Sequence, residues 1–232
     1  MFQIQGAFTE TGDTMIMSRN RMGFWLAVLT AGLTAISFSI GIFGTPLNSY
    51  PYPYLAPFIP VDFAWLIPAF ILMPVFVALT ASIHHITPNE RKIFSQIALS
   101  FAIICATVLM ADFFIQLTVV LPSTLKGETA GLSLFTEYNP HGVFVGLEAL
   151  GYLMMSTSFL SLAPIFNEGR LQKSIRGLFV ASFVLAVSSL VGLSLAGYDI
   201  VYFELIIISV NWTVLIVSGI LLGVLFRRAT KS

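Results

Sequence analysis

Five carboxylates lie inside or beside long apolar stretches of this 232-residue chain: Asp62, Asp112, Glu148, Asp199 and Glu204. Two of them, Asp112 and Glu148, fall within stretches long enough to cross a membrane. A charged side chain at the centre of a membrane helix costs roughly 2.5–3.5 kcal/mol on insertion scales. Such residues are therefore expected to have a function, such as carrying a proton or binding a cationic ligand.

The chemistry open to a buried carboxyl group depends on whether it is ionised. Surroundings of low dielectric constant disfavour the charged form. A protonated carboxyl group can carry a proton or donate a hydrogen bond between helices, whereas a cationic ligand can hold it ionised. Asp112 and Glu148 thus have a functional interpretation, as proton carriers or ligand contacts, and a structural one, as clasps between helices.

Composition indicates an integral membrane protein. Hydrophobic residues make up 57% of the chain and charged residues 9%, against about 25% charged residues in a typical soluble domain. The lipid bilayer is therefore the expected environment. The basic residues form no stripe with aromatic residues between them, so binding of nucleic acid is not supported. The single cysteine, Cys105, lies in an apolar stretch and is expected to pack as a small side chain.

Six stretches reach the length of about 20 apolar residues that a membrane helix needs. They predict an all-α, polytopic membrane protein whose single domain, residues 22–226, is a six-transmembrane-helix bundle. The expected spans are 22–43, 62–84, 93–121, 142–166, 175–196 and 200–226. Residues 1–21 are expected to form a polar N-terminal tail, and residues 227–232 a short C-terminal tail.

Orientation follows from the rule that Lys and Arg in short loops lie on the cytoplasmic side. Ten of the 11 basic residues lie on one side of the predicted bundle: Arg19, Arg21, Arg91, Lys92, Arg170, Lys173, Arg176, Arg227, Arg228 and Lys231. Only Lys126 lies on the other side. Both termini are therefore predicted to be cytoplasmic. Small size and the lack of a processing signal favour a prokaryotic inner membrane.

Local sequence signals predict two helix starts and an unusual loop. The segment Thr87-Pro88-Asn89-Glu90 matches a capping box with proline at the first helical position, which would start the third span. Asp62 follows Pro60 and can cap the second span. The first outer loop, 44–61, alternates tyrosine and proline in an uncharged core. It is expected to be an interfacial strap or a lid over an outer pocket.

The candidate site lies in the outer half of the predicted bundle. At about 1.5 Å of rise per residue, Asp112 is roughly 14 Å and Glu148 roughly 9 Å from the outer ends of their spans. Residues three, four or seven apart share a helix face. This spacing predicts an outward-facing polar chamber lined by Asp112, Gln116, Glu148, Tyr152, Glu204 and Asn211. Asp62, Trp65 and His141 are expected at its rim, and Trp212 can line it or pack outside it.

Cofactor and metal sites have little support in the sequence. His84 and His85 are adjacent at the inner end of the second span, and His141 lies at the outer end of the fourth. No two histidines can therefore hold one haem from opposite sides. Carboxylates and imidazoles suit several divalent metals, but the chain has neither a Glu-x-x-His pair nor an HExxH motif. No cofactor and no metal are expected.

Small residues on the first span predict a close helix contact. Ala27, Ala31 and Ala35 repeat every four residues, which lets helix backbones approach each other within the chain or with a partner protein. Six spans with cytoplasmic ends, a long first outer loop and this alanine face resemble the substrate-binding subunits of energy-coupling-factor vitamin importers. The resemblance, which no sequence motif accompanies, implies an outward-facing pocket under a loop and docking on a partner through the first span.

Three functions are compatible with these features. The first is binding or transport of a small cationic or proton-coupled solute at the outer carboxylates. The second is an intramembrane enzyme acting on a lipid-like substrate, with Asp112 and Glu148 as acid and base. No GxSxG motif indicates a serine nucleophile. The third is a structural or accessory subunit in which the carboxyl groups link helices.

Overall fold

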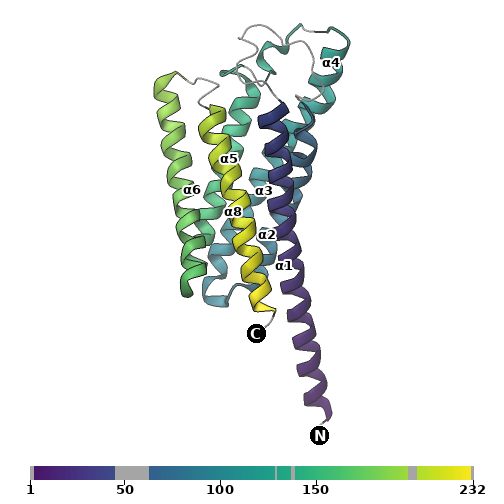
Figure 1. The fold of residues 1–232 in the computed structure, drawn as a ribbon, viewed down its shortest axis with the longest axis vertical. Helices are drawn as coiled ribbons and strands as arrows, with labels where there is room; N and C mark the ends of the chain where they lie inside the picture. The colour runs from purple at the N-terminus through teal and green to yellow at the C-terminus, as the bar shows by residue number, and fades with distance from the viewer. Residues whose placement is uncertain (1–2, 45–62, 129, 137–138, 198–202, 231–232) are drawn as a thin grey trace.

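Long helices form a bundle with both chain ends on the same side (Figure 1). The structure, a computed structural model, describes residues 3–44, 63–128, 130–136, 139–197 and 203–230. Within these ranges it contains no strand, and six helices are long and apolar enough to cross a membrane. The prediction of an all-α, multi-pass membrane protein is confirmed.

The spans are arranged around the bundle in chain order. The main helices are α1 (Gln3–Gly44), α2 (Leu66–Ile86), α3 (Lys92–Ile115), α5 (Val143–Leu162), α6 (Gly169–Ala196) and α8 (Ser209–Ala229). Each of these helices contacts the next, and α8 returns to pack against α1. The bundle is therefore a closed ring of helices, with an additional contact between α5 and α8 across it.

The third and sixth spans contain π-helical turns at the end of the bundle opposite the chain termini, which we call the outer end because the sequence predicts it to face outward. Helix α3 continues through η3 (Gln116–Val120) into α4 (Leu121–Leu125), and η6 (Phe203–Ile208) precedes α8. The sequence had predicted unbroken spans in both places. Pro122 gives a physical reason for the first interruption, because proline lacks an N–H group and its ring displaces the carbonyl group four residues earlier. The π-turn of η3 ends at Val120, two residues before this proline.

The predicted capping box does not start the third span. Helix α3 begins at Lys92 after the 3₁₀ turn η2 (Asn89–Arg91), and no side chain caps it. The Thr87 hydroxyl group instead donates to the Ile83 carbonyl group at 2.6 Å. Thr87 therefore closes the end of α2.

The second span begins later than predicted. Helix α2 starts at Leu66 with Trp65 at its N-cap position. The first outer loop and Asp62 itself, with the predicted strap or lid, lie outside the described residues. Other loop turns that the structure describes are η4 (Leu132–Leu134) and η5 (Ala163–Ile165).

Helix α1 is longer than a membrane span. Its 42 residues cover roughly 63 Å, about twice the hydrocarbon thickness of a bilayer. Its span-like part is Asn20–Phe43, and Figure 1 shows the N-terminal part extending beyond the bundle. The tail predicted over residues 1–21 is thus helical from Gln3.

Small residues bring α1 and α8 close together. A Cβ atom added to Gly219 would lie 2.8 Å from the Ala27 carbonyl oxygen and 2.9 Å from the Ala31 Cβ atom. At the start of the membrane-spanning part of α1, the Asn20 side chain donates to the carbonyl group of Ala229 at the end of α8, at 3.1 Å. The predicted alanine face is therefore used, at Ala27 and Ala31, for a contact within the chain.

The substitution Gly219→Ala is expected to destabilise the protein by about 1–3 kcal/mol, because the added methyl group meets the backbone of α1. Gly192→Ala in α6 is the matched control, since a Cβ atom added there has no neighbour within 4 Å. Unfolding of both variants in detergent micelles measures the difference. Equal stability of Gly219→Ala and the wild type would contradict the close α1–α8 contact.

Cysteine labelling tests the predicted orientation. Cys105 is the only cysteine and is buried, so a Cys105→Ala variant gives an unreactive background. Lys126 and Arg170 are exposed at opposite ends of the bundle. In intact cells, a membrane-impermeant maleimide should label Lys126→Cys and should reach Arg170→Cys only after lysis. The reverse pattern would show that the termini are not cytoplasmic.

Candidate functional site

Asp112 and Glu148 lie in the interior of the bundle on neighbouring helices. Asp112, in α3, is 0% exposed, and Glu148, in α5, is 6% exposed. Both carboxyl groups interact electrostatically with the phenol of Tyr152, which is also buried in α5. Helices α3 and α5 pack directly against each other. The structure therefore brings these three predicted site residues together in a region shielded from solvent.

One oxygen of Asp112 has no hydrogen-bond partner in the described part of the chain. Oδ1 accepts a long bond of 3.4 Å from Nε2 of Gln116, one turn further along. Oδ2 is buried and unpaired. Gln116 is buried too, so it shares the inward face of Asp112 as its spacing predicted. Leaving such an oxygen without a donor costs about 1–3 kcal/mol, and buried unpaired groups are rare in native proteins.

Positive charge is confined to the ends of the spans. The stretches 22–90, 93–125, 127–169 and 177–226 contain neither Lys nor Arg. The basic residues that flank Asp112 in the sequence, Lys92 and Lys126, therefore lie 20 and 14 residues away, at the two ends of its span, and are too far along the helix to balance an ionised carboxyl group. Removing an ion from water without a partner is strongly unfavourable. Neutrality at this position has to come from a proton or from an added cation.

A hydrogen bond between α5 and α8 fixes the hydroxyl group of Tyr152. Nε1 of Trp212 donates to Oη of Tyr152 at 2.8 Å, and both side chains are buried. An indole N–H group can only donate, so Oη is the acceptor and its own proton remains for a second bond. Asp112 and Glu148 carry the carboxyl groups whose charges act on this phenol.

Aromatic rings from four helices adjoin these polar groups. Trp65, at the start of α2, lies with its ring centroid 6.0 Å from Trp212 and 5.5 Å from Phe113 of α3. Phe38 of α1 lies 5.8 Å from Trp212. The Ser37 hydroxyl group donates to the Trp65 carbonyl group at 2.6 Å and joins α1 to the start of α2. We call Phe38, Trp65, Phe113 and Trp212 the outer aromatic cluster.

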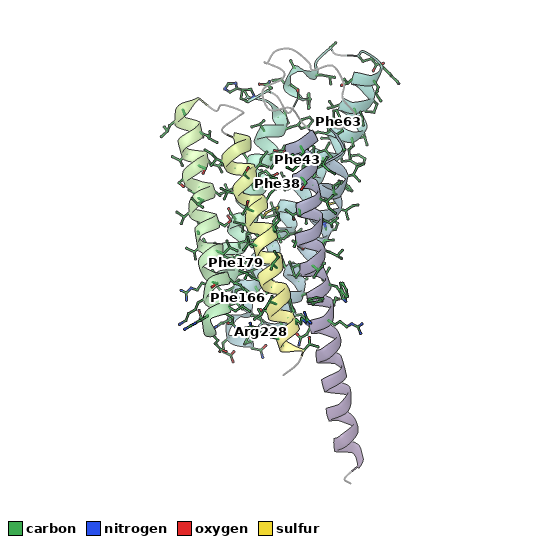
Figure 2. All side chains as sticks on the ribbon, viewed as in Figure 1. Phe38, Phe43, Phe63, Phe166, Phe179 and Arg228 are labelled. Carbon is green, nitrogen blue, oxygen red and sulfur yellow. The ribbon has the colours of Figure 1, made fainter. Side chains whose placement is uncertain are left out.

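A second set of rings lies toward the other end of the bundle. Phe159 stacks on Phe179 with centroids 4.6 Å apart, and Phe76 and Phe166 pack edge-on against this pair. Figure 2 shows Phe166 and Phe179 toward the end that carries Arg228, whereas Phe38 lies in the opposite half. This inner phenylalanine cluster consists of one residue type, and it packs α2, α5 and α6 together.

Both π-helical segments touch candidate residues. Gln116 is the first residue of η3. Nδ2 of Asn211 donates to the carbonyl group of Ile207, in η6, at 2.8 Å. Asn211 is fully buried, and its Oδ1 atom has no partner among the described residues. Because π-turns are frequent at functional sites, the outer ends of the third and sixth spans are consistent with a site there.

Three predicted residues are not placed with this group. Asp62 and the side chain of Glu204 lie outside the described part of the chain. Glu204 also belongs to η6, where the α-helical spacing that grouped it with Asn211 does not apply. His141 is exposed ahead of α5, and its backbone N–H group donates to Oδ1 of Asn139 at 3.0 Å. The predicted site is therefore placed only in part.

The aromatic component is what sequence reasoning underestimated. Trp65 was expected at the rim, but it is 8% exposed and lies inside the bundle. The sequence allows Trp212 either to line the chamber or to pack outside it, and its position beside the polar Asn211 is the signal that favours the first. Nothing in the sequence marks Phe38 and Phe113 as site residues, because the chain contains 21 phenylalanines and the spacing does not distinguish these two from the others.

Comparisons with models of known protein families, with curated proteins and with solved structures found no match. Within the described ranges, no group of three or more His, Cys, Asp or Glu side chains could hold a metal ion. The function is therefore inferred from the chemistry of the buried residues.

The Tyr152–Trp212 bond can be measured with a double-mutant cycle. Tyr152→Phe is expected to lower the free energy of unfolding by about 1–3 kcal/mol, because the buried indole N–H group loses its acceptor. Trp212→Phe should also destabilise the protein, and the double variant should lose less than the sum. Trp25→Phe, at a ring that is 54% exposed, is the control. Strictly additive losses would show that the bond does not stabilise the α5–α8 contact.

Proposed function

We propose that this multi-pass membrane protein binds or transports a small cationic or proton-coupled solute at a site formed by Asp112, Glu148 and Tyr152. The observation that carries the proposal is the unpaired Oδ2 atom of the fully buried Asp112. It lies in a bundle whose spans have no Lys or Arg away from their ends. A bound cation or proton supplies the missing partner.

The neighbouring side chains have separate roles in this proposal. Gln116 orients the Asp112 carboxyl group through Oδ1 and leaves Oδ2 for the cation. Glu148 provides a second acidic group on the facing helix. Tyr152, which is fixed by Trp212, offers its phenolic proton to whichever carboxyl group is ionised.

Access in this proposal is from the outer side of the membrane, expected to be a prokaryotic inner membrane. The site residues are buried, so entry requires the outer ends of the third and sixth spans to part. Those ends contain η3 and η6, and Asn211 bonds to the latter. Glu204 within η6 and Asp62 ahead of α2 are the acidic residues that the sequence predicts along this route.

The pattern of hydrogen bonds argues against a purely structural role for Asp112. A clasp between helices requires a bond from the carboxyl group to another helix. The bond to Oδ1 comes from Gln116 of the same span. The link between α5 and α8 is made by Trp212 and Tyr152 instead. Asp112 is therefore better explained by a ligand or a proton than by a clasp.

Replacing the Asp112 carboxyl group tests the proposal. Asp112→Asn keeps the size of the side chain and removes its charge, so the affinity for a cation should fall by at least about tenfold. Thermal shifts of the protein in nanodiscs with sodium, potassium and methylammonium chloride measure binding. The internal pH of proteoliposomes loaded with pyranine measures proton movement. Glu128→Gln, which removes an exposed outer carboxylate, is the matched control.

Two results would contradict the proposed function. One is a wild-type protein that responds neither to these three salts nor to a proton gradient. The other is an Asp112→Asn variant whose responses equal those of the wild type. A response that Asp112→Asn loses and Glu128→Gln keeps is the expected outcome.

A further inference from the structure

The outer aromatic cluster indicates the chemical class of the solute. We propose that the cation is an organic ammonium ion, with its nitrogen at the carboxyl groups of Asp112 and Glu148 and its apolar part against Trp65 and Trp212. This inference rests on the proposed function and names the ligand of the same site.

The rings and one hydrogen bond link the helices that carry the acidic groups. Phe113 follows Asp112 in α3 and meets the ring of Trp65. The Trp65 ring meets Trp212, and Trp212 bonds to Tyr152. The charge of Asp112 acts on the Tyr152 phenol. Carboxyl groups and rings from α2, α3, α5 and α8 therefore share one buried region.

Two of the three ring pairs in this cluster meet at steep angles, and the third, Phe38 with Trp212, is tilted by 36°. The planes of Trp65 and Phe113 are inclined by 79°, and those of Trp65 and Trp212 by 63°. In such pairs the flat faces of the two rings are not stacked on each other. An aromatic face attracts a cation, tryptophan attracts it most strongly, and the attraction is greatest away from water. Rings combined with carboxylates therefore suit a cation that has apolar surface.

Metal ions and protons would use fewer of these carboxyl groups and aromatic rings than an organic ammonium ion would. Calcium takes about six to eight oxygen ligands and magnesium a near-octahedral set. The buried oxygen donors identified here come from a few side chains, Asp112, Gln116, Glu148 and Asn211. A proton requires the carboxyl groups but no aromatic wall. The tryptophans therefore favour an ion that carries carbon around or beside its charge.

The inner phenylalanine cluster is an example of aromatic rings that only pack helices together. There Phe159 and Phe179 stack at 17° between ring planes, and the other two pairs meet edge-on at 72° and 74°, so ring angles alone do not distinguish the two clusters. The outer cluster instead contains two tryptophans, whose buried N–H groups are unfavourable unless they are paired. Trp212 uses its N–H group to fix Tyr152 beside the carboxyl groups. The outer rings are thus coupled to the acidic groups, whereas the inner rings only pack.

A series of n-alkylammonium ions tests the inference. The chain has three tryptophans, so in a Trp25→Phe background the tryptophan fluorescence comes from Trp65 and Trp212 alone. Methyl-, ethyl-, n-propyl- and n-butylammonium chloride are titrated into this protein in nanodiscs. The affinity is expected to rise about two- to fourfold with each added methylene group. Neutral n-butanol, which shares the longest chain, should give no saturable change.

Substitutions at Trp65 test the contribution of the aromatic ring separately from that of the charged carboxyl group. Trp65→Leu should weaken n-butylammonium binding, measured by thermal shift, about tenfold. Trp65 is preferred to Trp212 because substitution at Trp212 would also break the bond to Tyr152. Trp65→Phe retains a ring and should bind only about two- to threefold more weakly, which covers the case in which the leucine variant does not fold. Trp25→Leu, at a lipid-facing ring, is the control.

The outcomes separate this inference from the proposed function. Equal affinity for methyl- and n-butylammonium, or wild-type binding by a folded Trp65→Leu variant, overturns the inference. A response to sodium or protons alone that requires Asp112 also overturns it, while the proposed function stands. The absence of any cation or proton response overturns both. Tighter binding of longer ammonium ions that requires both Asp112 and the Trp65 ring supports both.

Discussion

A carboxyl group in hydrocarbon needs a partner for its charge or its proton, and this requirement organises the outer half of the bundle. Asp112 has Gln116 on one oxygen and nothing from the described chain on the other. Lys and Arg occur only near the ends of the spans. The closed ring of helices shields the carboxyl groups from solvent, and the Trp212–Tyr152 bond holds a phenol beside them. Each of these features makes an unpaired carboxyl group at Asp112 less favourable, and the described chain supplies no partner for its second oxygen.

Properties that extend over a whole segment were predictable from the sequence. Burial of about 20 residues in lipid requires a long apolar run, so the spans could be located without knowing any contact. Spacing along one helix was equally informative for Gln116 beside Asp112 and for Tyr152 beside Glu148, because α-helical geometry alone decides which residues share a face. In both cases the sequence contains all the information that the structure uses.

Contacts between segments were not predictable in the same way. The hydroxyl group of Thr87 could cap the next helix or close the previous one, and the structure has the second arrangement. The π-turns of η3 and η6 change the register of the third and sixth spans, so a spacing rule cannot be carried through them to Glu204. The outer aromatic cluster depends on how α1, α2, α3 and α8 pack together. No single stretch of sequence contains that arrangement.

Because α1 is long, a tilt of this helix would move both of its ends. One end of this helix carries Ser37, which bonds to the backbone of Trp65, and its middle is packed tightly against Gly219 of α8. If the helix tilts by about 5° about its midpoint, each end moves by roughly 3 Å. A small rearrangement of the rings around the carboxyl groups would therefore be accompanied by a movement in the opposite direction at the far end of α1, beyond the membrane.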